Sequence, residues 1–170
     1  MLKFFNGPAM EKIIKEGGLQ GTSFEGKWNF TPHLAFSSDI TYTQAKFLKG
    51  YGPLPSILPF YGAAMLQYNK DKLLIRIRSR FSGSKSPQDY SLGGEDGLDE
   101  TPEQINPQGI TNYIGTPSWS VLNLSGSYSW KEKTTLRAGI ENIFDVHYRE
   151  FASGISASGR SLMVGVGYEF

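Results

Sequence analysis

The chain has 170 residues, with 17 lysines and arginines against 16 aspartates and glutamates, and no cysteine. This near-neutral balance gives no electrostatic footprint for nucleic acid, and the lack of thiols excludes disulfide frameworks and thiolate metal sites. Twenty glycines and an aromatic content of 14% favour an all-β chain, while no apolar run is long enough for a spanning helix.

The first 16 residues follow no regular pattern. Met1 to Phe5 resembles the start of a signal peptide, but Asn6, Gly7 and Pro8 interrupt the apolar run that export requires. If the protein is exported, we expect the numbered chain not to be the whole precursor. The stretch 11–16 predicts either a short helical turn or part of a loop.

Seven segments then alternate apolar and polar residues with period two, which predicts antiparallel β-strands. They cover about 18–30, 33–47, 60–69, 72–82, 118–130, 133–143 and 160–170. Three connections are tight turns, whereas those over about 48–59, 83–117 and 144–159 are long. Short and long connections alternate strictly, as they do in outer-membrane barrels with short periplasmic turns and long external loops.

The two phases of these strands differ in charge. The polar phase carries Glu25, Lys27, Asp39, Lys72, Arg76, Arg78, Arg80, Arg137, Glu141 and Glu169, whereas the apolar phase carries no charge over its central stretches. This segregation favours strands with one lipid-facing side and one side facing a polar lumen. A soluble sandwich or barrel with its apolar side inward would show the same alternation, so the pattern alone leaves both open.

Aromatic residues cluster beside the short turns. They are Trp28, Phe30, Tyr68, Tyr128, Trp130, Tyr168 and Phe170. Amphipathic rings at one depth on several strands indicate an interfacial girdle, although such residues also favour strands in general.

The most specific sequence lies after residue 115. One predicted strand ends in Asn142-Ile143-Phe144-Asp145, Tyr148 follows, and Gly159-Arg160 opens a last strand that reaches Phe170. This pattern resembles the C-terminal end of TonB-dependent outer-membrane receptors, in which the penultimate strand ends in Asn-Leu-Phe-Asp. The resemblance implies that residues 1–170 are the C-terminal part of such a receptor's β-barrel, without its plug and N-terminal strands.

The resemblance also implies roles for single residues. Asn142 and Asp145 would turn the backbone where the strand leaves the membrane. Gly159 would take a turn conformation closed to other residues. Arg160 would lie at the membrane boundary on the loop side. Phe170 resembles the terminal aromatic that barrel-assembly machinery reads.

The function implied is transport rather than enzymatic chemistry. Such receptors take up a scarce nutrient (an iron chelate, haem, cobalamin or an oligosaccharide) across the Gram-negative outer membrane, driven by TonB acting on the plug. Their barrels close at about 22 strands, so seven strands would contact outer-membrane lipid and the rest of the receptor chain. Two alternatives remain: a small self-contained outer-membrane barrel with a structural or adhesion role, which needs a further strand from residues 1–16, and a soluble lipocalin-like binding protein.

Arg76, Arg78 and Arg80 alternate along the polar phase of one strand. Their guanidinium groups can contact an anionic substrate or plug carboxylates. We expect instead that they pair with Glu or Asp on neighbouring strands.

The loop over 83–117 is acidic. Glu95, Asp96 and Asp99 can offer oxygen ligands to Ca²⁺, but their spacing matches no EF-hand and a solvated surface loop is the simpler interpretation. His33 and His147 fall at opposite ends of the strands and cannot share a metal. The sequence therefore predicts no catalytic constellation and no cofactor.

Overall fold

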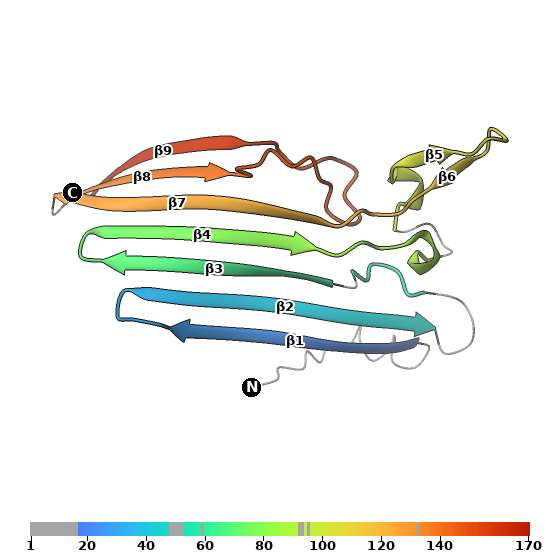
Figure 1. Ribbon diagram of the computed structural model, residues 1–170, viewed down its shortest axis with the longest axis horizontal. Coiled ribbons are helices and arrows are strands. Elements are labelled where there is room, and N and C mark those ends of the chain that lie inside the picture. The colour runs from blue at the N-terminus through green and yellow to red at the C-terminus, as the bar shows by residue number, and fades with distance from the viewer. Residues whose placement is uncertain (1–16, 48–52, 59, 92–93, 95, 132) are drawn as a thin grey trace.

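The computed structural model describes residues 17–47, 53–58, 60–91, 94, 96–131 and 133–170. One antiparallel sheet of seven strands runs in the order β1-β2-β3-β4-β7-β8-β9 (Figure 1). Its strands are β1 (Gly17–Asn29), β2 (Leu34–Phe47), β3 (Phe60–Lys70), β4 (Leu73–Ser82), β7 (Trp119–Lys131), β8 (Thr134–Glu141) and β9 (Ser161–Tyr168). All seven predicted strands and the all-β class are confirmed, with ends that differ by no more than two residues.

The strand register places the apolar phase of all seven strands on one face. A single unbroken row crosses the sheet through Trp28, Phe36, Leu66, Ile77, Leu124, Ile140 and Leu162. Period-two alternation fixes this result, because a slip of one residue in any pair would move that strand's apolar set to the other face.

Most of these apolar side chains are not buried. Trp28 is 45% exposed and Val164 is 88% exposed, and in the described part of the chain only Leu54, Ala63, Tyr90 and Val121 are buried apolar residues. A soluble sheet would bury this face against a second layer. The exposed apolar face is instead what a lipid-facing wall requires.

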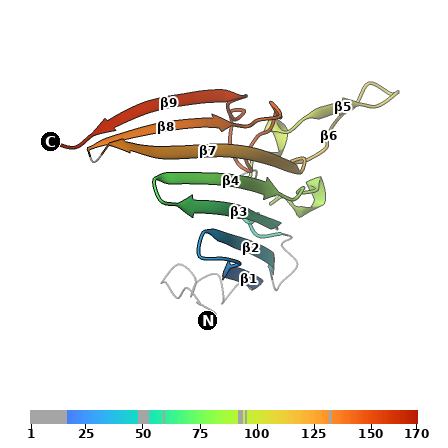
Figure 2. The same ribbon diagram turned by 60° about the vertical axis from the view of Figure 1, so that its left-hand side comes forward.

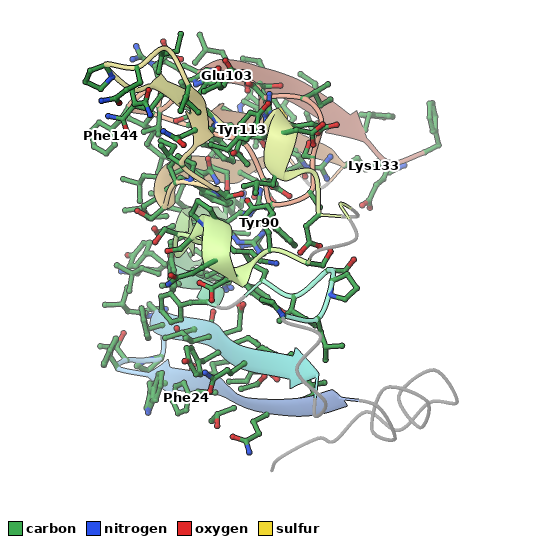
Figure 3. All side chains as sticks on the ribbon, turned by 90° about the vertical axis from the view of Figure 1, so that its right-hand side faces the viewer. Phe24, Tyr90, Glu103, Tyr113, Lys133 and Phe144 are labelled. Atoms are coloured by element: carbon green, nitrogen blue, oxygen red, sulfur yellow. The ribbon has the colours of Figure 1, made fainter. Side chains whose placement is uncertain are left out.

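The sheet is twisted and curved (Figures 2 and 3). Figure 3 shows Phe24 and Phe144 projecting from its convex side, whereas Tyr90 lies on its concave side. The apolar face is therefore the convex face and the polar phase lines the concave face. A lipocalin-like protein would have the opposite arrangement, with apolar residues lining the inside.

The connections have the predicted rhythm. The short turns and the C-terminus lie at one end of the sheet, and the long connections lie at the other (Figure 1). The long connection over 83–117 contains structure that the sequence analysis did not predict: two 3₁₀ turns, η1 (Pro87–Asp89) and η2 (Leu98–Glu100), and a hairpin of β5 (Glu103–Ile105) and β6 (Thr111–Tyr113). No helix among the described residues has the length and apolar character to cross a membrane.

Aromatic rings mark both ends of the convex face. At the short-turn end, Trp28 stacks between Phe24 and Phe36, with ring centroids 5.9 and 5.7 Å apart. At the long-loop end, Tyr42 pairs with Phe60 across β2 and β3, and the Phe60 ring lies 5.6 Å from that of Phe81 on β4. The predicted girdle lay at the short-turn end alone and shares Trp28 with the first group, whereas the second group, on the same phase of the strands, was not predicted.

Candidate functional site: the concave wall and the long loops

The three arginines of β4 all project from the concave face, but each has a different environment. Arg80 Nη2 lies 2.6 Å from Glu150 Oε1, and its guanidinium lies over the Trp119 ring at 5.7 Å. Arg76 Nε donates a hydrogen bond of 2.9 Å to Gln67 Oε1.

The expected pairing with carboxylates on neighbouring strands is wrong for the described residues. Arg76 is flanked by Gln67 and Ser125, Arg78 by Met65 and Asn123, and Arg80 by Ala63 and Val121. The one acidic partner, Glu150, comes from the long loop after β8. A loop contact of this kind has no signature in strand alternation.

A hollow of about 250 Å³ lies on the concave face beneath the long loops. Its wall is formed by Asp39 of β2, Ala63 of β3, and Arg78 and Arg80 of β4, among others. Loop residues Leu58, Glu150 and Phe151 also line it, together with Trp119 at the start of β7. It is a polar hollow with aromatic and aliphatic residues at its loop end.

A buried ion pair holds the long loops together. Lys85 Nζ lies 2.8 Å from Asp96 Oδ2, and both side chains are at most 2% exposed. Lys85 Nζ also donates to the Ile57 carbonyl at 2.9 Å, and Asp96 Oδ1 accepts the Ser56 N–H at 2.6 Å. The pair therefore connects the loop over 83–117 to residues 53–58 of the preceding long loop.

Aromatic rings complete this loop cluster. Lys85 Nζ lies 4.1 Å from the Phe151 ring centroid and 5.0 Å from that of Tyr90, so the third long loop also contacts the ion pair. Tyr90 Oη lies 2.5 Å from Thr116 Oγ1. Burial raises the pKa of the Tyr90 phenol, the Asp96 charge adds to this, and the Thr116 hydrogen bonds oppose it.

These contacts change the interpretation of the acidic loop. Both carboxylate oxygens of Asp96 accept hydrogen bonds within the cluster, and Asp99 is exposed. Among the described residues no group of three potential ligands could hold a metal ion, and Glu95 lies outside them. The calcium-site hypothesis for Asp96 is therefore replaced by its role as the partner of Lys85.

Asn142 and Asp145 turn the chain after β8, as predicted. Both have positive φ, +50° and +54°. Asn142 Oδ1 accepts the Val146 N–H and its Nδ2 donates to the Val146 carbonyl, each at 2.9 Å. Asp145 Oδ1 accepts the Arg160 N–H at 2.7 Å, which ties the turn to the residue before β9.

The predicted reason for Gly159 is wrong. Gly159 does not have a positive φ; instead, a Cβ at this position would lie 2.7 Å from Asp145 Oδ1. Glycine fits here because the Asp145 carboxylate occupies the space that a Cβ would take, and Arg160 follows on the loop side as expected.

The remaining motif residues lie apart. Tyr148 packs on Trp119 with ring centroids 4.3 Å apart. Phe144 is 69% exposed on the convex face, and Phe170 is fully exposed with its ring 5.3 Å from that of Tyr168. The assembly role of Phe170 stays a prediction. His33 and His147 lie at opposite ends of the sheet, His33 in the β1–β2 turn and His147 in the loop after β8.

Neither family models nor curated proteins provide a match to this sequence. Solved structures do. "Copper transporter OprC" aligns with 91% of this chain at a TM-score of 0.70 and 18% identity. The ferric-catecholate import receptor Fiu from E. coli K12 aligns with 91% of this chain at a TM-score of 0.64 and 16% identity. The ferric enterobactin receptor PfeA from Pseudomonas aeruginosa aligns with 89% of it at a TM-score of 0.60 and 16% identity.

The chain spans 23%, 21% and 22% of the length of these three proteins, respectively. All three are TonB-dependent outer-membrane receptors. At identities this low, the similarity establishes the fold alone. That fold agrees with the strand register, the exposed convex face and the alternation of short and long connections. The described strands have the fold of a wall segment from the β-barrel of TonB-dependent outer-membrane receptors.

Proposed function

We propose that this chain forms part of the wall and external loops of an outer-membrane receptor that transports a nutrient. The observation that carries the proposal is the unbroken apolar row across the convex face of all seven strands. An exposed apolar convex face and a charged concave face suit a wall between lipid and an aqueous lumen. The fold of copper and siderophore receptors supports the same proposal.

The finer proposal is TonB-dependent uptake of a scarce nutrient in a Gram-negative bacterium, without enzymatic chemistry. The candidate classes are iron chelates, haem, cobalamin and oligosaccharides. Residues 1–170 would be the C-terminal part of the receptor, and the plug and remaining strands would complete the barrel. Further strands would pair the outer edges of β1 and β9, and this supports the proposal because unpaired backbone groups in lipid are costly.

The test uses the protein at its natural length in its own host. We expect it in the outer-membrane fraction, extracted only by detergent, with a mobility on electrophoresis that changes on boiling. Uptake of the radiolabelled nutrient should be lost when either its gene or tonB is deleted. Recovery in the aqueous phase without detergent would contradict the membrane proposal, and unchanged uptake after tonB deletion would contradict the finer one.

A further inference from the structure

We propose that the hollow beneath the long loops binds a small zwitterion, one or two amino-acid residues long, between Asp39 and Arg78. The proposal rests on the proposed function, because it requires the concave face to line a path for solutes. It adds a substrate class that the fold does not specify.

The hollow exists because a small residue separates two charged ones. Asp39, Ala63 and Arg80 lie in one register row across β2, β3 and β4. Neighbouring strands are about 4.8 Å apart, so the outer two backbones of this row are about 10 Å apart. Ala63 does not fill that gap, and the hollow of about 250 Å³ opens over it.

Two opposite charges border the hollow without partners of their own. Arg80 is engaged by Glu150 at 2.6 Å, but in the described part of the chain neither Asp39 nor Arg78 forms an ion pair. Both side chains are exposed and both line the hollow. Across β1 and β2, moreover, Asp39 faces Glu25, and like charges directly opposite each other repel. A ligand cation beside Asp39 would relieve this repulsion.

The spacing fits a ligand with charges at both ends. Arg78 lies two residues along β4 from the Asp39 row, so its backbone is about 12 Å from that of Asp39. Both side chains project from the same face of the sheet, so their charged groups can stand on the order of 10 Å apart and bracket a ligand of two extended residues, which spans about 7 Å before its hydrogen bonds. An ammonium group would lie at Asp39, and a carboxylate would accept hydrogen bonds from Arg78.

The loop end of the hollow supplies an apolar contact. Trp119, Leu58 and Phe151 line it there, and the Trp119 ring contacts both the Tyr148 ring and the Arg80 guanidinium. An apolar or aromatic ligand side chain can pack against this surface. A simple anion or a simple cation would engage only one of the two charges, so the site favours a ligand that carries both.

The test uses the detergent-purified receptor at its natural length and titration calorimetry. The probe is glycyl-phenylalanine, which carries both charges and a ring; the comparison probe is N-acetyl-glycyl-phenylalanine amide, which carries neither charge. We expect saturable binding of the free dipeptide only. Asp39→Asn and Arg78→Gln should each weaken it about tenfold or more, whereas Arg78→Lys should retain part of it.

The matched control is Arg137→Gln, which removes a concave-face charge outside the hollow and should leave binding unchanged. No saturable binding, equal binding of the blocked peptide, or wild-type affinity in Asp39→Asn would each overturn the proposal. A change in mobility on boiling verifies folding of every variant. A receptor that folds and transports its nutrient but fails these tests would refute the zwitterion site alone.

Discussion

At the scale of single residues, Asn142 fixes the point where β8 ends. Its backbone is left-handed, the residue is 4% exposed, and its N–H donates to Asn123 Oδ1 of β7 at 2.8 Å. Asn142→Ala removes the two bonds to Val146 and leaves partly buried backbone groups of that residue unpaired. We expect it to destabilise the loop after β8 by about 2–3 kcal/mol. The measurement is the rate of limited proteolysis of that loop, with the exposed Asn112→Ala as the control; equal rates would contradict the role.

Gly159 gives a second prediction with an internal control. An added methyl must displace Asp145 Oδ1, which then loses its bond to the Arg160 N–H. We expect Gly159→Ala to cost about 1 kcal/mol in urea-dependent unfolding of the receptor. Gly165→Ala on β9 should be neutral, because no atom lies within 4 Å of its added Cβ. Similar unfolding midpoints for both variants would mean that the carboxylate moves away without loss.

At the scale of elements, the strands and the loops differ in how far the sequence predicts them. Strand ends and faces were predictable because alternation is a local pattern, and the strand pairing brings the apolar phases of all seven strands to the same face. The loop contacts were not, because their partners are distant: Arg80 and Glu150 are 70 positions apart. Likewise, nothing in the sequence around Lys85 predicts that this side chain is buried. The position of the turn motif after β8 was predictable. The reason for a glycine at 159 was not, because it depends on where the Asp145 side chain lies.

The buried ion pair predicts that the three long loops are stabilised together. Lys85→Met leaves Asp96 buried without a cation, and we expect a loss of about 3–5 kcal/mol. Backbone hydrogen exchange should therefore rise at 53–58 and beside Phe151, as well as within the loop over 83–117. Arg80→Gln breaks the half-exposed pair with Glu150 and should cost less than about 1 kcal/mol. An effect of Lys85→Met confined to its own loop would contradict the coupling.

The loop cluster also predicts a pH dependence through Tyr90. Burial raises the pKa of its phenol above the unfolded value of about 10. The neutral phenol therefore stabilises the fold fully below pH about 10, and this stability is lost as pH rises through the higher folded pKa. Proteolysis of the loop over 83–117 should accelerate as the pH rises through the folded pKa of Tyr90, and the absorbance of the phenolate should rise over the same pH range. Tyr90→Phe should abolish this acceleration of proteolysis at high pH, although Lys85 and Asp96 remain. Tyr61→Phe, at an exposed position, should leave the acceleration unchanged.

At the scale of the whole molecule, the sheet has two chemically different faces and no second layer. Its convex apolar side chains gain stability only if something apolar covers them, at about 25 cal/mol for each Å² removed from water. The concave face carries the charged residues and the packed loops on its long-loop side. This asymmetry is the property that separates a membrane wall from a soluble barrel with the same strands.

Leu124 and Ser125 test that asymmetry, because they are adjacent on β7 and face opposite sides. Leu124 lies in the apolar row between Ile77 and Ile140, whereas Ser125 lies on the concave face beside Arg76. We expect Leu124→Lys to cost about 2–4 kcal/mol near the middle of the membrane and to reduce the folded receptor in the outer membrane. Ser125→Lys should be tolerated, because its ammonium group remains in water. If the convex face were the solvated side of a soluble barrel, the order would reverse, and Leu124→Lys would be the harmless substitution.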